Sequence, residues 1–268
     1  MRQLKQIVLV LLTPAVIAMA IGCAQTTPNV WDDPAYEDWE FFNGGPIKFF
    51  YPPEHMHKAN LGDYCNNYIR SAEQICELLA ISVPAETLIV VYYTGFGQGR
   101  TMTEREYPFA QDSIIHFWLP SHPGPSMVDW LLPKWSSVDS RHDFLRHGMR
   151  SLFDFSGQNY HSGIYAYRNR GMLMTLEELV ADTTVDSDLE RLQSCHAASF
   201  VAFILAEYGP TRLRTLYESP NPFDSTVNSV LHLSVGSLET AWMGYAAQST
   251  PDSILNPPEE ALDSSTTE

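Results

Sequence analysis

The residues best suited to metal chemistry lie in the stretch from Phe144 to Phe153, which contains His147. Its apolar residues flank both ends, and this pattern predicts a half-buried helix. A helix can bind zinc through two histidines one turn apart, and an acid beside the first one activates the metal-bound water. Here the five positions from His147 read His-Gly-Met-Arg-Ser. Gly148 therefore occupies the position of the general base and Ser151 that of the second ligand.

A second register of the same helix supplies no base either. In that register Asp143 and His147 take the ligand positions and Phe144 takes the position of the acid. His142 is five residues from His147, so the two side chains point about 140° apart on a helix and would not share a metal. His161 lies in a segment that we expect to be a loop, from which it could join Asp143 as a replacement ligand.

Other patterns that could carry chemistry are interpreted as structural. Cys195 and His196 are adjacent on a predicted helix, so their side chains point ~100° apart and are poorly placed for proton transfer. The glycines of Thr94–Gly99 are spaced as in a phosphate loop, but no Lys-Ser/Thr pair follows them. We expect a plain loop there, a surface position for His55, and a packed aromatic role for His116.

The elements that must position these residues are strands first and helices later. The expected strands are Ile47–Tyr51, Leu88–Tyr93 and Asp112–Leu119, the last at an edge, with an amphipathic helix over 58–80. The Pro-rich stretch 121–137 is expected to be a loop or lid. The expected helices then cover 138–155, 171–184, 191–208, 211–218, 222–231 and 235–247. This order predicts an α+β fold, with a small mixed β-sheet and an N-terminal helix followed by a mainly helical C-terminal half.

The order of these pieces resembles the peptidase MA-like, gluzincin type of zinc metallopeptidase over nearly all of residues 46–248. The pieces that carry it are Ile47–Tyr51, the helix to Ala80, Leu88–Tyr93, Ser113–Leu119, His147–Ser151, Glu178–Ala181, Phe200–Gly209 and Leu238–Trp242. The resemblance implies that Glu178 stands where the third zinc ligand belongs, with Leu179 in place of the usual glycine. It also implies that Asp182 takes the place of a carboxylate that orients a ligand histidine, and that a cleft accepts a peptide or protein ligand.

Three functions follow from this resemblance. Because the base and the second ligand are missing, we expect a degenerate site without a cofactor, in a protein that acts in binding or assembly. The first alternative is an active metal-dependent peptidase or hydrolase that binds zinc through His147, Glu178 and one of Asp143, Asp182 or His161. The second alternative is a purely structural envelope lipoprotein without any function of the cleft.

The helix expected over 138–155 also carries Arg141, Arg146 and Arg150. Arg146 and Arg150 are one turn apart, so they share a face. Two carboxylates without a metal would repel each other and would need a cation nearby. We therefore expect Arg146 or Arg150 to form an ion pair with Glu178 or Asp182.

The N-terminus predicts export and lipid anchoring. Arg2 and Lys5 precede an apolar run that ends in Ala20-Ile21-Gly22-Cys23, which resembles a bacterial lipobox. Residues 1–23 are expected to be a lipoprotein signal peptide, with Cys23 as the lipidated residue and the protein held on the membrane of the cell envelope, outside the cytoplasm. An ordinary secretory signal or an uncleaved anchor is the alternative.

Acidic residues concentrate in two tails, while the chain as a whole carries a net charge of −16. Residues 24–45 hold five acids and no base, and residues 249–268 hold another five acids and no base. We expect an acidic linker over 24–45, one domain over 46–248, and a disordered acidic tail over 249–268. This balance argues against a nucleic-acid partner, because binding phosphates needs clustered Lys and Arg.

Three cysteines remain beside Cys23. Cys65 and Cys76 are 11 residues apart on one predicted helix, about 16 Å along its axis, and cannot bond each other. Either one could pair with Cys195, and three buried thiols are the alternative.

Overall fold

The computed structural model describes residues 34–55, 57–105, 108–118, 123–154, 157–181 and 187–250, without the side chains of 187–189. The chain divides into two units, Met1–Glu37 and Asp38–Glu268. Of the first unit only residues 34–37 are described, with the short 3-10 helix Pro34–Tyr36, and the second unit contains every element discussed below. The expected signal peptide with Cys23, the residue Asp182, and positions 251–268 of the acidic tail lie outside the described residues.

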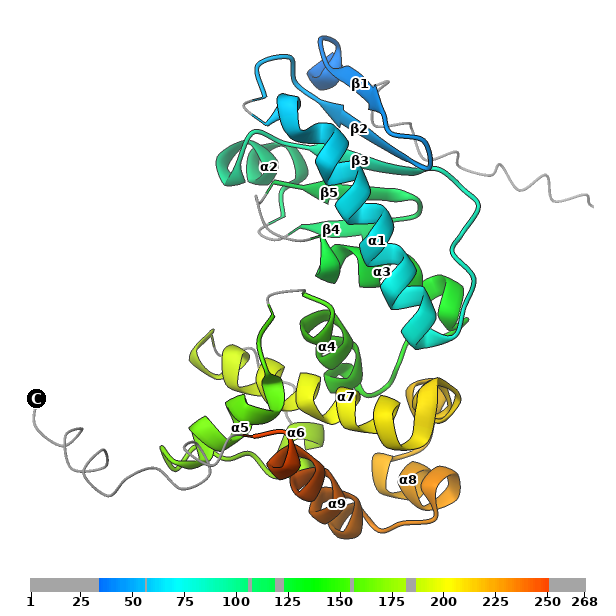
Figure 1. The fold of residues 1–268 in the computed structure, drawn as a ribbon, viewed down its shortest axis with the longest axis vertical. Coiled ribbons are helices and arrows are strands. Elements are labelled where there is room, and N and C mark those ends of the chain that lie inside the picture. Colours follow the sequence, from blue (N-terminus) through cyan, green and yellow to red (C-terminus); the bar gives the residue numbers. More distant parts are fainter. Residues whose placement is uncertain are drawn as a thin grey trace, which may run out of the picture. The chain divides into compact units, whose positions relative to one another are not determined.

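A mixed five-stranded sheet forms the N-terminal half of the second unit, in the order β1-β2-β3-β5-β4 (Figure 1). The strands are β1 (Glu40–Asn43), β2 (Ile47–Tyr51), β3 (Leu88–Tyr92), β4 (Phe109–Gln111) and β5 (Ile114–Phe117). β2, β3 and β5 are parallel, with Phe49 opposite Val90 and Val90 opposite Ile115. β1 and β4 pair antiparallel with their neighbours at the two edges.

Two of these strands differ from expectation. β4 pairs with the outer edge of β5. β5 therefore lies inside the sheet, and the predicted edge position for 112–119 is wrong. β1 lies within the stretch interpreted as an acidic linker, where Phe41 stacks on Phe50 of β2 at 4.6 Å between ring centroids. Aromatic pairing across strands explains why this acidic segment joins the sheet.

Helix α1 (Leu61–Leu79) follows a short 3-10 helix (Lys58–Asn60) and crosses one face of the sheet (Figure 1). Its buried residues recur every three or four positions, as predicted. They are Leu61, Cys65, Tyr68, Ser71, Ala72, Ile75, Cys76 and Leu79. Because these spacings place the side chains on one stripe, α1 packs against the sheet and contributes to the main core.

Two stretches predicted as loops are helices. α2 (Phe96–Thr103) follows β3 directly, and Gly99 lies so close to the ring of Trp118 that an added Cβ would come within 2.5 Å of it. α3 (Gly124–Trp135) buries Met127, Val128, Leu131 and Trp135 among others. The prolines obscured this stripe, although Pro125 stands in the first turn, where a missing N–H costs nothing.

The C-terminal half is helical around α7 (Ser187–Glu218), which contacts every other helix of this half (Figure 1). These helices are α4 (Asp143–Leu152), α5 (Tyr160–Arg168), α6 (Leu176–Ala181), α8 (Phe223–Leu231) and α9 (Val235–Gln248). α7 kinks at Gly209, which has a φ of 78°, followed by Pro210. This kink is where the sequence predicted one helix to end and the next to begin.

The α+β class, with a small mixed sheet and a mainly helical C-terminal half, is therefore confirmed. Several helix bounds are not, since the helix expected over 138–155 covers only 143–152, and the expected loop around His161 is α5. Asn159 caps α5 by accepting a hydrogen bond from the Ser162 N–H at 3.0 Å. Within the described residues, no helix combines the length and the apolar character needed to cross a membrane.

Candidate functional site

His147 lies on the exposed side of α4. Asp143, one turn earlier on the same helix, is exposed as well. The pKa of His147 is lowered, first because neighbouring atoms remove part of its hydration and then because Arg150 is nearby. Asp143 and Glu190 of α7 act in the opposite direction. The structure thus places Glu190, an acid of another helix, near His147. The sequence alone did not single out this residue.

Gly148, at the position of the general base, faces α7. A Cβ at this position would lie 2.5 Å from the carbonyl oxygen of Ala197 and 2.7 Å from Cγ2 of Val201. Both neighbours are fully packed, with Ala197 at 1% and Val201 at 0% exposure. The absent side chain allows α4 and α7 to approach closely. The position of the base is therefore a helix–helix contact that has no room for a carboxylate.

The alternative register also lacks a general base, because the position of the acid is taken by Phe144, a core residue. Its ring lies 5.7 Å from that of Phe200 and 5.3 Å from that of Phe223. His142, just before α4, joins the same cluster, with its ring 5.3 Å from Phe223. Burial lowers the pKa of His142, and its Nε2 has no hydrogen-bond partner. This end of α4 is therefore an apolar contact with α7 and α8.

Glu178 forms a capping box at the start of α6. The Thr175 N–H and hydroxyl donate to Oε2 of Glu178 at 2.8 and 2.9 Å. In return, the Glu178 N–H donates to the Thr175 hydroxyl at 3.1 Å. These bonds lower the pKa of Glu178, the backbone bond from Thr175 contributing most. The sequence signal was present as Thr175-x-x-Glu178, the pattern of a helix start, and the interpretation as a zinc ligand overlooked it.

The two arginines of α4 bind Asp129 of α3. Arg146 Nη2 lies 3.2 Å from Oδ1, and Arg150 Nη2 lies 3.5 Å from Oδ2 of this carboxylate, whose side chain is only 7% exposed. The shared face predicted for the two arginines is thus real. No ion pair of either arginine with Glu178 exists, so that half of the expectation is wrong, and Asp182 lies outside the described residues.

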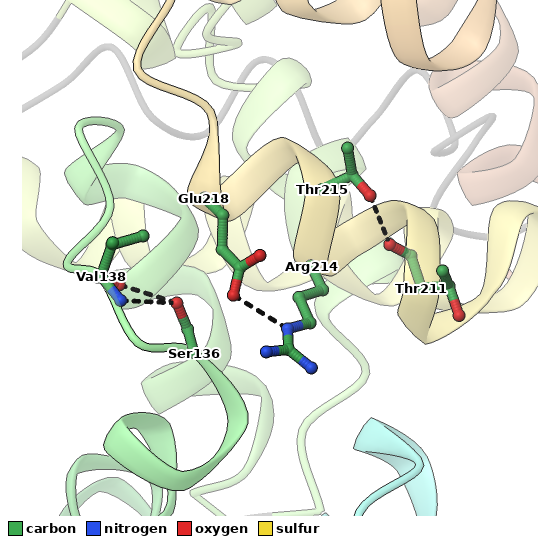
Figure 2. A network of polar contacts seen from close by, with 6 residues as sticks. All are labelled: Ser136, Val138, Thr211, Arg214, Thr215 and Glu218. Atoms are coloured by element: carbon green, nitrogen blue, oxygen red, sulfur yellow. Dashed lines mark hydrogen bonds and ion pairs between the residues drawn. The ribbon is translucent and has the colours of Figure 1, made fainter.

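A surface pair on α7 contrasts with this buried carboxylate. Arg214 Nε donates to Oε1 of Glu218 at 2.9 Å within one helical turn (Figure 2). The side chains of this pair are 46% and 31% exposed, against 7% for Asp129. The same view shows the turn after α3, which two hydrogen bonds of the Ser136 hydroxyl stabilise. This hydroxyl donates to the Val138 carbonyl at 2.8 Å and accepts from the Val138 N–H at 3.2 Å. Arg214, and secondarily Ser136, lower the pKa of Glu218.

The remaining histidines of this half have structural partners. Nδ1 of His196 donates to the Leu192 carbonyl at 2.8 Å, and its Nε2 accepts the Met174 N–H at 3.3 Å. This pair of bonds fixes one neutral tautomer, in agreement with the lowered pKa that burial produces. His161 bonds the buried Ser199 hydroxyl through Nδ1 at 2.9 Å, and therefore does not replace a lost ligand beside Asp143.

The histidines of the sheet half are also packed. His116 stacks on Phe109 at 4.5 Å and bonds the Tyr93 hydroxyl through Nδ1 at 2.8 Å, as expected of a packed aromatic. Burial lowers its pKa to about 4. His55 is 2% exposed, so its predicted surface position is wrong. Its Nε2–H donates to the Tyr93 carbonyl at 2.9 Å, while Nδ1 accepts the His57 N–H.

The three described cysteines are free and buried. Burial raises the pKa of the Cys65 thiol to about 11 and that of Cys195 to about 12. Neither thiol is therefore an active nucleophile, and the option of a bond from Cys65 or Cys76 to Cys195 is not realised.

Across the ranges that the structure describes, no three His, Cys, Asp or Glu side chains are grouped so that they could hold an ion. His147 is exposed on α4 and Glu178 is engaged in its cap on α6. The chain matches no protein-family model, no curated protein and no solved structure.

Proposed function

We propose that this chain is a lipid-anchored protein of the cell envelope whose gluzincin-like fold carries no catalysis and serves binding or assembly. The observation that carries this proposal is the contact at Gly148. Gly148 stands where the resemblance requires a general base, and a Cβ added there would lie 2.5 Å from the backbone of α7. A carboxylate there would push the two helices apart instead of reaching a substrate.

Two further features support a structural role for the remaining motif positions. Glu178 uses its carboxylate to cap α6, and the cations of α4 neutralise Asp129 instead of a vacant ligand set. Glu178, the one described group besides His147 that the resemblance assigns to zinc chemistry, already has a partner within the fold. The partner that this protein binds would be a peptide or a protein of the envelope.

The anchor is the part of this proposal that can be tested first. Cys23→Ser removes the thiol that would be acylated, so the variant should lose labelling by radiolabelled fatty acid and leave the membrane fraction. Cys195→Ser keeps Cys23 and provides the matched control, which should stay labelled and membrane-bound. Continued labelling and membrane retention of Cys23→Ser would reject the lipoprotein assignment.

The absence of catalysis needs its own assay. The purified protein should release no product from a mixed peptide library, with or without added zinc. Product formation that disappears in His147→Ala would reject the binding role and favour a rearranged active site.

A further inference from the structure

The connection between α5 and α6 exposes two neighbouring apolar side chains. Met172 is 41% exposed and Leu173 is 38% exposed. Among the exposed large apolar residues of the described ranges, this is the only pair adjacent in sequence. Arg168 and Arg170, just before them, are exposed as well. These four side chains, on the segment Arg168–Leu173, are called the basic-apolar loop below.

The loop is held rigidly at its first end by the termination of α5. Gly171 adopts a φ of +70°, its N–H donates to the Arg168 carbonyl at 2.9 Å, and the Met172 N–H donates to the Tyr167 carbonyl at 3.0 Å. This pair of bonds is the Schellman motif, which places a glycine directly after the helix. The turn therefore fixes the point at which Met172 leaves the helix.

The second end is held equally firmly. The Met174 N–H donates to the buried Nε2 of His196 at 3.3 Å, and Thr175 opens α6 through its capping box with Glu178. Met174 itself is buried, at 9% exposure. Because both ends are bonded to the helical core, the exposure of Met172 and Leu173 is a fixed feature of the fold and not the result of a frayed terminus.

The charge of this segment is opposite to that of the rest of the chain. Residues 155–176 contain no Asp or Glu, although the chain carries 32 acids and a net charge of −16. Neither Arg168 nor Arg170 forms an ion pair with a residue that the structure describes. The Arg168 guanidinium instead lies over the ring of Tyr165, 5.7 Å from its centroid. With respect to the described residues, two cations thus lie beside two exposed apolar side chains without an acidic partner.

We propose that the basic-apolar loop contacts the surface of an anionic phospholipid membrane. This rests on the proposed function, since a lipid anchor would keep the domain next to such a surface. At the membrane interface, apolar side chains reach the acyl boundary while guanidinium groups bind the phosphates. A protein partner is less suitable because a stable interface needs about 800 Å² from each side, far more than six residues of one turn present.

The test places an environment-sensitive fluorophore on Leu173→Cys in the full-length protein, reconstituted into vesicles. Cys65, Cys76 and Cys195 are buried with raised pKa values, so they should label slowly. The unsubstituted chain measures any background label. Val83→Cys, at a site 48% exposed between α1 and β3, is the matched control for an exposed apolar position without neighbouring arginines.

We expect the Leu173 label to shift to the blue in vesicles of phosphatidylcholine and phosphatidylglycerol in equal parts, and not in phosphatidylcholine alone. The Val83 label should not shift in either. Each Arg near an anionic surface contributes about 1 kcal/mol to the free energy of binding. Replacing both arginines, as Arg168→Gln with Arg170→Gln, should therefore lower the ratio of bound to free loop about thirtyfold.

Three results would overturn the proposal: no shift with anionic vesicles, an equal shift with both lipids, or a shift already present without vesicles. The last would mean that another part of the chain, such as the acidic C-terminal segment, covers the loop. Fatty-acid labelling of Cys23 is read separately. An unlabelled Cys23 with a shifted loop probe would remove the anchor but keep the membrane contact, so the two failures are distinguishable.

Discussion

Two glycines in helices offer a matched comparison of the contact between α4 and α7. Gly148 lies inside α4 against α7, and Gly244 lies inside α9 with no atom within 4 Å of an added Cβ. Replacing either by alanine removes the same backbone freedom, which stabilises a helix by about 0.5–1 kcal/mol. Only at Gly148 would the new methyl group meet a neighbour, 2.5 Å from the Ala197 carbonyl oxygen.

That contact decides the sign of the effect. Overpacking of this kind costs about 1–3 kcal/mol, and the backbone of α7 cannot move aside as a side chain would. Gly148→Ala should therefore lower the free energy of unfolding by about 1–2 kcal/mol, while Gly244→Ala raises it by about 0.5–1 kcal/mol. Gly148→Glu, which restores the missing base in sequence, should destabilise further because it also places a carboxylate against the Ala197 carbonyl.

Urea unfolding followed by circular dichroism measures all three variants against the parent chain. The midpoint should fall for both Gly148 variants and rise for Gly244→Ala, with unchanged dependence on urea concentration. Equal stabilisation by Gly148→Ala and Gly244→Ala would contradict the close contact at Gly148, because it would mean that a methyl group fits between α4 and α7.

Three further changes test the other contacts. Thr175→Ala should lower the free energy of unfolding by about 1 kcal/mol through loss of the α6 cap, whereas Thr240→Ala inside α9 should be neutral by the same urea assay. Asp129→Asn should cost about 2 kcal/mol by leaving the two arginines of α4 unpaired, against less than about 0.5 kcal/mol for Glu218→Gln at the exposed pair, and equal losses would contradict the burial of Asp129. His116 has a folded pKa of about 4 against 6.5 when unfolded, so its contribution is full above pH 6.5 and declines by about 3 kcal/mol as the pH falls to 4, and a flat profile of unfolding free energy over this range would contradict its burial.

The sequence was most informative where one stripe of side chains determines an element. The spacing of Leu61, Cys65, Tyr68 and Ala72 predicted α1 correctly, and the apolar run 88–93 predicted the central strand. It was least informative at α3, where two prolines concealed a buried stripe that only the packing reveals.

The candidate site was harder to predict because its groups are defined by partners that are distant in sequence. Asp129 is 17 residues from Arg146, and no local pattern links them. Gly148 looks like a simple loss until Ala197 and Val201 are seen above it. Glu178 is the exception, because its cap was readable from Thr175 three residues earlier.

The metal content of the purified protein shows whether the helix around His147 is a packing element without a zinc centre. Full-length protein purified without chelator, and His147→Ala beside it, would be measured by inductively coupled plasma mass spectrometry after incubation with one equivalent of zinc and removal of free metal. We expect far less than one zinc per chain and no difference between the two proteins. One tightly held zinc per chain in the parent, lost in His147→Ala, would contradict it.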